Sequence, residues 1–219
     1  MPELGFIFDW DGVIVDSSVL HEKSWEALAQ EIGRPLPPNH FKQGFGKRNE
    51  IIIPEILKWS KDPQQIKNWG ERKEALYREF AKETGIHLLP GVKDFLQEMQ
   101  RHQIPAVIGT STSRENISLA FEQLGIKGFF TGAICSEDVT RGKPDPEVFL
   151  TGAKLLQLPP GQCVVFEDST HGIEAARAGE MKAVAIKTSQ TEADLYQAGA
   201  HMLVDTPKEL TIRSIQQLM

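Results

Sequence analysis

Short apolar runs alternate along the chain with longer segments in which apolar residues recur every three or four positions. The short runs predict strands, at residues 6–8, 104–109, 133–135, 163–166, 183–186 and 202–204. The longer segments predict helices, at residues 17–32, 63–83, 90–101, 114–124, 145–156 and 171–178. Strands that alternate with helices are typical of an α/β fold, so we predict a doubly wound parallel sheet with helices on both faces.

The connection between the first two predicted strands is much longer than a parallel sheet needs. About a dozen residues would suffice, yet this connection runs from Gly12 to Ile104. Residues 17–84 have a helical pattern throughout. We therefore expect a small α-helical cap domain at residues 17–84, inserted into an α/β core domain of residues 1–16 and 85–219.

Capping signals mark the ends of several predicted helices. Ser17 and Ser113 precede two of them and are expected to be N-caps. Gly33 is expected to end the first helix. Asp62, followed by a proline, is a third expected N-cap.

Two carboxylates, Asp9 and Asp11, follow the first predicted strand directly. One interpretation is structural, because Asp-Gly between apolar runs is a strong hairpin signal and Asp11-Gly12 has that pattern. The other is chemical, because open α/β sheets bind ligands at the carboxyl ends of their strands. Carboxylates there can bind a hard cation, or divide the roles of nucleophile and acid/base. The stretch alone does not decide between these interpretations.

Composition narrows the class of protein. The 219 residues are 40% hydrophobic and 25% charged, and the formal net charge is −6. These values are typical of a soluble globular protein and disfavour nucleic acid or an anionic membrane as partner. No apolar run approaches the ~20 residues that cross a bilayer, and no basic-then-apolar segment opens the chain. We expect a cytoplasmic protein in which Cys135 and Cys163 are buried free thiols.

Polar clusters follow two further strands, Thr110-Ser111 and Glu167-Asp168, and Lys143 lies in a loop just before a helix. Each cluster alone has a structural explanation, as a turn, a helix start or a solvated surface charge. The carboxyl ends of parallel strands meet at one edge, however, so these groups can converge with Asp9. Carboxylates that bind Mg²⁺, with a hydroxyl and a lysine for the phosphoryl oxygens, make a coherent phosphoryl-transfer site.

Four motifs occur in order along the chain: Asp9-Trp10-Asp11-Gly12-Val13, Thr110-Ser111, Gly142-Lys143-Pro144 and Phe166-Glu167-Asp168-Ser169. Together they resemble the motifs of the haloacid dehalogenase (HAD) superfamily. The chain looks like the branch with a helical cap after the first strand, which holds phosphoglycolate phosphatase-like enzymes and β-phosphoglucomutase. The resemblance covers essentially the whole chain and implies a Rossmann-like HAD core with an inserted cap.

The resemblance also implies roles for the motif residues. Asp9 would be the nucleophile and a metal ligand, and Asp11 the general acid/base, which also binds Mg²⁺ through its backbone carbonyl. The phosphoryl group would be held by Ser111 and Lys143, with Thr110 beside the substrate. The metal site would be completed by Glu167 and Asp168. A second aspartate favours phosphate esters over halides, because the departing alkoxide must be protonated.

The cap and the second-phosphate region resemble β-phosphoglucomutase at His21, Arg48, Lys73 and Ser113. Arg114 is a further candidate contact for a second phosphate, although Glu115 next to it departs from the mutase pattern.

We therefore predict a Mg²⁺-dependent phosphatase that hydrolyses a small-molecule phosphate ester, expected to be a sugar phosphate. The alternatives are a β-phosphoglucomutase-like phosphohexomutase and, behind it, a catalytically silent regulatory or binding protein of the same fold. Neither nucleic acid nor membrane is an expected partner. A monomer is the expected assembly, with a dimer as the alternative.

Overall fold

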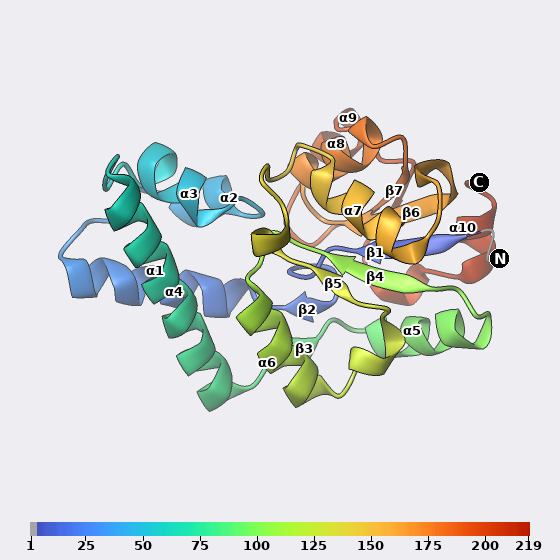
Figure 1. Cartoon of the computed structure of the whole chain (residues 1–219), viewed down its shortest axis with the longest axis horizontal. Coiled ribbons are helices and arrows are strands. Elements are labelled where there is room, and N and C mark those ends of the chain that lie inside the picture. Colours follow the sequence, from blue (N-terminus) through green and yellow to red (C-terminus); the bar gives the residue numbers. More distant parts are fainter. Residues whose placement is uncertain (1–3) are drawn as a thin grey trace.

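Six parallel strands form the main sheet, in the order β5-β4-β1-β6-β7-β8 (Figure 1). The structure is a computed structural model that describes residues 4–219, so residues 1–3 of the expected core lie outside the described residues. The strands are β1 (Gly5–Phe8), β4 (Ala106–Gly109), β5 (Ala133–Ile134), β6 (Cys163–Glu167), β7 (Lys182–Ile186) and β8 (Met202–Val204). The predicted α/β parallel sheet is thus confirmed.

Helices cover both faces of this sheet (Figure 1). One face packs against α5 (Val92–Arg101), α6 (Arg114–Leu124) and α10 (Ile212–Gln216), and the other against α7 (Glu147–Leu156), α8 (Thr170–Ala178) and α9 (Glu192–Gln197). Strand β1 contributes side chains to the apolar clusters on both faces, because successive side chains of a strand point to opposite sides. Phe6 and Phe8 lie in the first cluster and Ile7 in the second, and all three are buried.

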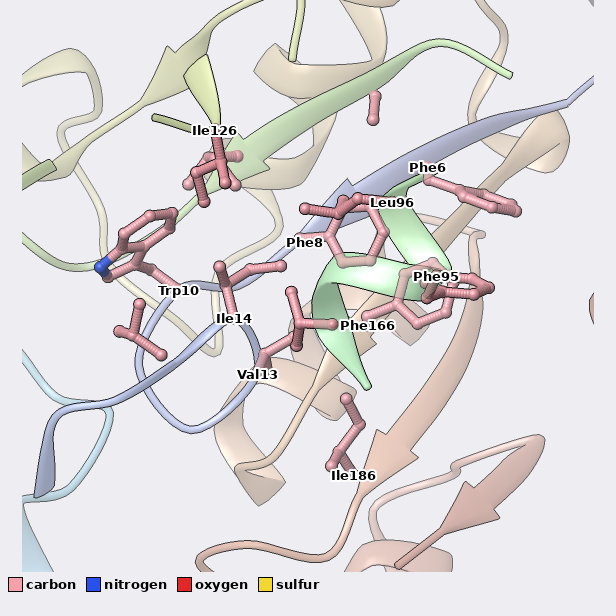
Figure 2. Close-up of a cluster of buried hydrophobic side chains, with 14 of the residues drawn as sticks. Phe6, Phe8, Trp10, Val13, Ile14, Phe95, Leu96, Ile126, Phe166 and Ile186 are labelled. Carbon is pink, nitrogen blue, oxygen red and sulfur yellow. The ribbon is translucent and has the colours of Figure 1, made fainter. Parts of the chain in front are cut away.

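The segment that carries Asp9 and Asp11 is anchored by the first of these clusters. Figure 2 shows Trp10, Val13 and Ile14 of the loop after β1 among the buried side chains, and each is at most 1% exposed. Upstream, the ring of Phe8 stacks on that of Phe166 of β6 with their centroids 4.4 Å apart. Apolar burial on both sides of Asp9 therefore fixes the backbone from which the carboxylates project.

Residues 17–84 are helical for most of their length, as predicted, and we call them the helical lobe. They contain α1 (Ser18–Ile32), α2 (His40–Gly44), α3 (Asn49–Ile51), a π-helical turn (Ile52–Ile56) and α4 (Pro63–Thr84). The lobe has its own apolar cluster, which includes Trp25, Leu28, Ile53 and Trp59. In Figure 1 it lies to the left of the sheet, and its helix α4 contacts α6.

The two connections between lobe and sheet pair with each other. β2 (Val15–Asp16) runs antiparallel to β3 (His87–Leu88), a short ribbon that the sequence pattern does not reveal. The hairpin interpretation of Asp11-Gly12 does not hold, because β2 pairs with β3 and not with β1. Gly12 does turn the chain, with a φ of 75° that favours glycine.

The predicted helix ends are confirmed in position, but two of the expected N-caps make no capping hydrogen bond. Gly33 ends α1 in the left-handed conformation, and Asp62 accepts hydrogen bonds from the amides of Gln64 and Gln65. Ser17 and Ser113 make no such bond at the starts of α1 and α6. Ser17 instead uses its hydroxyl in the cluster of polar side chains described below.

Within residues 4–219 no helix combines the length and the apolar character needed to cross a bilayer. Cys135 and Cys163 are buried and unpaired, as predicted.

Candidate active site

The polar clusters at the strand ends converge on one cavity. Asp9 and Asp11 follow β1, Thr110 and Ser111 follow the neighbouring β4, and all four line this cavity. The helical lobe closes it from the other side with His21, Arg48 and Lys73, among other residues. Two segments that are distant in the sequence thus form one site between sheet and lobe.

A buried lysine joins the ends of β1 and β6. The Nζ of Lys143 donates to Asp9 Oδ1 at 2.7 Å and to Glu167 Oε1 at 2.6 Å, and its side chain is only 2% exposed. Burial alone would lower the pKa of Lys143, but the charges of Asp9 and Glu167 raise it above its usual range. Lys143 is therefore an ammonium held inside the site and not a solvated surface charge.

Glu167 is fixed by the loop that follows it. Its Oε2 accepts hydrogen bonds from the amides of Asp168 and Ser169, at 2.9 and 2.8 Å, and from the Ser169 hydroxyl at 2.9 Å. The close fit extends to Gly172 of α8, where a Cβ atom would lie 1.8 Å from the Glu167 carboxyl carbon. Only glycine leaves room for this carboxylate at the start of α8.

Asp168 lies next to Asp9 with one oxygen unsatisfied. Its Oδ2 accepts from the Thr188 hydroxyl at 3.0 Å, whereas its buried Oδ1 accepts no hydrogen bond from residues 4–219. Asp9, Glu167 and Asp168 each offer an oxygen within 4.8 Å of the others, and all three are buried. A buried, unpartnered carboxylate oxygen in such a group fits a bound cation.

The electrostatics of the cluster agree with this interpretation. Burial raises the pKa of Asp9 to about 7, assisted by Glu167 and Asp11 and opposed by Lys143. The pKa of Asp168 is also raised, by burial and by the charges of Glu167 and Asp9. Crowded carboxylates with raised pKa values gain most from a cation that compensates their charge.

Asp11 has very different neighbours. Its Oδ1 accepts hydrogen bonds from the Ser17 hydroxyl at 2.5 Å and from His21 Nε2 at 3.1 Å, and its Oδ2 accepts from the Thr112 hydroxyl at 2.5 Å. Burial tends to raise the pKa of Asp11, but the interaction with His21 and these hydrogen bonds bring it below its ordinary value.

Lys73 fixes the tautomer of His21. The Nζ of Lys73 lies 2.7 Å from His21 Nδ1, and an ammonium can only donate. His21 Nδ1 therefore accepts, and its proton resides on Nε2, where it points at Asp11. The ring is also stacked on Tyr77, with centroids 4.3 Å apart. His21 and Lys73, two residues of the helical lobe that the sequence analysis identified, thus set the environment of Asp11.

The candidates for a second phosphate are only partly brought together. The Arg48 guanidinium reaches three backbone carbonyls of the loop after β5, those of Ser136, Val139 and Thr140. Arg48 Nε and the Ser113 hydroxyl line the cavity and have no hydrogen-bond partner among residues 4–219.

Arg114 is not among the residues that line the cavity. It is exposed and pairs with Asp138. Glu115, which departs from the mutase pattern, is 73% exposed and pairs with Arg78 of α4 at 2.7 Å.

Several residues of the site escaped the sequence predictions. Ser17 was assigned to a helix cap, and Thr112, Glu74 and Asn116 carry no motif. Thr188 follows the end of β7, so the strand-end argument that identified Asp9 and Thr110 also applies to it. Glu74 and Asn116 lie within helices α4 and α6, where nothing in the pattern distinguishes them from surface residues.

Comparison with known proteins gives the site a context. A family model described as haloacid dehalogenase-like hydrolase matches residues 6–186. The chloroplastic 5-amino-6-(5-phospho-D-ribitylamino)uracil phosphatase of Arabidopsis thaliana is 38% identical over 98% of this chain, which spans 57% of that relative's length.

Two further relatives are matched over nearly their whole length. The β-phosphoglucomutase of Bacillus subtilis is 28% identical over 96% of this chain and 93% of that protein. The crystal structure of a HAD hydrolase of family IA, variant 3, from Entamoeba histolytica has a TM-score of 0.89 and 28% identity, and the match covers 98% of each chain.

In metal-free protein we expect Asp9→Asn to become more stable relative to the wild type as pH rises. The pKa of Asp9 is raised from 3.8 to about 7, so the folded protein holds a proton that the unfolded chain releases. This contribution to stability is fully present below the unfolded pKa and is lost as pH rises through the folded pKa. Asparagine cannot ionise and escapes the loss. The free energy of unfolding can be measured with urea in the presence of EDTA at about pH 5 and pH 8. Between these pH values, the difference in this free energy between Asp9→Asn and the wild type should change by an amount on the order of 2 kcal/mol.

The control for this comparison is Asp94→Asn, an exposed aspartate at the start of α5. Its stability difference from the wild type should be nearly the same at both pH values. A constant difference for Asp9→Asn as well would contradict the raised pKa.

Proposed function

The chain belongs to the haloacid dehalogenase-like hydrolase family, and on that premise we propose that it is a Mg²⁺-dependent phosphatase of small phosphorylated metabolites. In this proposal Asp9 is the nucleophile and Asp11 is the general acid/base. The similarity to a phosphatase at 38% identity supports the activity class.

One observation supports the proposal most directly: Asp9 and Asp11, which are separated by a single residue, have different hydrogen-bond partners. Asp9 belongs to an acidic cluster and accepts a hydrogen bond from the buried ammonium of Lys143. Asp11 accepts hydrogen bonds from Ser17, His21 and Thr112. Carboxyl groups whose environments differ in this way can take different roles in one reaction. Both line the same cavity, within reach of one bound phosphate ester.

The reaction follows from these positions. Asp9 attacks the phosphorus atom and forms an aspartyl-phosphate, while the leaving alkoxide takes a proton from Asp11. Asp11, now a carboxylate, removes a proton from water, which attacks the phosphorus of the intermediate and restores Asp9. Lys143 and Ser111 contribute charge and a hydrogen bond to the phosphoryl oxygens, where preorganised donors lower the barrier.

We assign Mg²⁺ to Asp9 and Asp168, with the backbone carbonyl of Asp11 and the charge of Glu167 completing the site. The unpartnered Oδ1 of Asp168 supports this assignment. When bound, Mg²⁺ would supply positive charge that neutralises the phosphoryl oxygens and lowers the pKa of Asp9.

In the ligand-free protein the pKa order is the reverse of what the reaction needs. The pKa of Asp9 is raised to about 7 and that of Asp11 is lowered. The dianionic phosphate of a substrate beside Asp11 disfavours its carboxylate form and therefore raises its pKa. Ligand binding thus prepares Asp9 to attack and Asp11 to donate a proton.

The substrate is a small phosphate ester with a polar carbon skeleton. The Arabidopsis relative, by its name, acts on a phosphorylated ribityl compound, which favours a sugar or polyol phosphate here. We further propose that residues 17–84 form a cap domain that opens to admit this substrate. Contacts across the cavity, such as those of Arg48 with the loop after β5, support closure over the bound ester.

A phosphomutase is the second candidate, and one observation favours it. Ser113 Oγ and Arg48 Nε are both buried without a hydrogen-bond partner among residues 4–219, although Arg48 Nε lies 3.5 Å from Glu50 Oε2. Both residues line the cavity. They offer donors to a second phosphate, which a mutase must hold while a sugar hydroxyl attacks the phosphoenzyme. The 28% identity to β-phosphoglucomutase agrees with this reading.

A neighbouring carboxylate favours hydrolysis. The Glu137 side chain accepts hydrogen bonds from the backbone amide of Arg114 at 3.1 and 3.2 Å, so it lies at the start of α6 beside Ser113. The Arg114 guanidinium is bound to Asp138. A second phosphate dianion would meet the charge of Glu137 and would have to displace both carboxylates. We therefore rank phosphatase above mutase.

Asp9→Asn should lose turnover by several orders of magnitude while remaining folded, because an amide cannot attack phosphorus. Steady-state phosphate release measures the rate, and circular dichroism and thermal unfolding check the fold. Asp94→Asn should keep wild-type activity. An Asp9→Asn protein with more than a tenth of the wild-type rate, about 1.4 kcal/mol in barrier, would refute the nucleophile assignment.

Chelation with EDTA should abolish activity and Mg²⁺ should restore it. Ca²⁺ should inhibit, because it prefers more ligands at longer distances. Asp168→Asn should raise the Mg²⁺ concentration for half-maximal rate by tenfold or more, roughly 1.4 kcal/mol of binding energy. Mg²⁺ titration calorimetry should show the same loss independently of activity. Full activity in excess chelator would exclude the metal.

With β-glucose 1-phosphate, Mg²⁺ and a trace of the 1,6-bisphosphate, phosphate should be released faster than glucose 6-phosphate forms. Glu137→Gln should bind the bisphosphate at least about threefold more tightly, whereas Glu122→Gln, an exposed glutamate further along α6, should not. Glucose 6-phosphate that forms many times faster than phosphate would replace the phosphatase with the mutase.

A further inference from the structure

A buried glutamate continues the hydrogen-bond chain that begins at Asp11. Glu74 follows Lys73 on α4, and its Oε1 accepts from Lys73 Nζ at 3.0 Å and from Asn49 Nδ2 at 2.8 Å. Its Oε2 accepts from Asn116 Nδ2 at 2.6 Å. The side chain is 15% exposed. Burial would raise the pKa of Glu74, but the charge of Lys73 and the hydrogen bonds from Asn49 and Lys73 outweigh it and lower the pKa to about 2. Glu74 is therefore a carboxylate at neutral pH.

Glu74 is the carboxylate counter-ion of Lys73. The Lys73 side chain is only 4% exposed, and Glu74 is its one carboxylate partner among residues 4–219. A buried lysine without a counter-ion tends to lose its proton or to move toward solvent. A neutral amine can accept a hydrogen bond, so the ammonium state is what compels His21 Nδ1 to be the acceptor.

The tautomer of His21 determines whether His21 can donate a hydrogen bond to Asp11. If His21 carried its proton on Nδ1, its Nε2 lone pair would face the Asp11 carboxylate at 3.1 Å. Two acceptors at that distance repel each other, so Asp11 would lose one of its three donors and its fixed orientation. The orientation of Asp11 therefore depends on a carboxylate two side chains away.

Asn116 ties this chain to the sheet side of the cavity. It lies on α6, is 1% exposed, and donates to Glu74 across the interface between α6 and α4. Its Oδ1 accepts from Arg78 Nη1 at 3.0 Å, and Arg78 also pairs with Glu115 of α6. The carboxylate of Glu74 is thus fully bonded only while the helical lobe lies against α6.

We propose that Glu74 is a positioning residue for Asp11: through Lys73 it sets the tautomer of His21, and through Asn116 it links this setting to contact between lobe and sheet. The role rests on the proposed function, in which Asp11 protonates the leaving group. Glu74 itself touches neither substrate nor metal in this scheme. In the phosphoryl-transfer step, its loss should therefore affect only esters whose leaving group needs the proton from Asp11.

Leaving groups of different basicity test this directly. An alkyl phosphate such as glucose 6-phosphate releases a basic alkoxide, whereas p-nitrophenyl phosphate releases a weakly basic phenolate that needs little protonation. Hydrolysis of the aspartyl-phosphate is common to both esters, so the comparison uses kcat/KM, which reports the step in which the leaving group departs. Glu74→Gln should lower kcat/KM on the alkyl ester at least about tenfold and on the aryl ester less than about threefold. Glu71→Gln, an exposed glutamate three residues earlier on α4, is the matched control and should change neither.

The His21 tautomer gives a readout that does not depend on activity. Nitrogen-15 shifts of the His21 ring, assigned by their absence in His21→Asn, should report a single Nε2–H form in the wild type and a mixture in Glu74→Gln. If Glu74→Gln does not fold, Asn116→Ser provides a second test, because it removes a hydrogen bond to Glu74 and leaves Glu74 itself in place. It should show the same selective loss on the alkyl ester, by a smaller factor.

Equal losses on both esters, or an unchanged tautomer in Glu74→Gln, would overturn the proposal. A wild-type protein that hydrolyses neither ester would refute the proposed function instead. The tautomer measurement then still decides whether Glu74 controls His21.

Discussion

The Lys143 ammonium between the Asp9 and Glu167 carboxylates is the interaction on which the site depends. Strands β1 and β6 are neighbours in the sheet, so their ends bring these two carboxylates together inside the protein. Without a cation between them, their repulsion and desolvation would oppose the folded state. The loop that delivers Lys143 is itself held, because Glu147 accepts hydrogen bonds from the amides of Thr140 and Arg141. Fold and charge distribution are therefore specified by the same contacts.

Chemistry and control come from different parts of the molecule. The loops of the sheet carry Asp9, Lys143 and Asp168, which the rigid parallel strands position. The helical lobe carries His21, which bonds to Asp11, and Lys73, which bonds to His21, so this chain of contacts exists only while lobe and sheet are in contact. If Asp11 is the acid/base group and the lobe moves, as proposed, Asp11 is ready for proton transfer only when the cavity is closed.

The strand-end residues could be predicted because the physics behind them is simple. Parallel strands end at one edge, so polar residues after apolar runs converge, and this argument found Asp9, Thr110 and Asp168. Ser17 and Ser113 stand at the predicted N-cap positions, but position alone could not tell that their hydroxyls do not cap the helices or that Ser17 donates to Asp11. Glu74 and Asn116 were missed for another reason. Their importance depends on the docking of α4 against α6, and residue spacing within either helix carries no information about that docking.

The ribbon of β2 and β3 has a consequence for how such a protein can change over evolutionary time. Val15 pairs with Leu88 and Asp16 with His87, so the inserted segment leaves and re-enters the sheet region at adjacent positions, about one strand spacing apart. An insertion whose ends are close together places little strain on its host. A different helical segment with adjacent ends would fit at this ribbon. Such an exchange would change the residues that face the cavity from the lobe, while Asp9 and Lys143 remain in place.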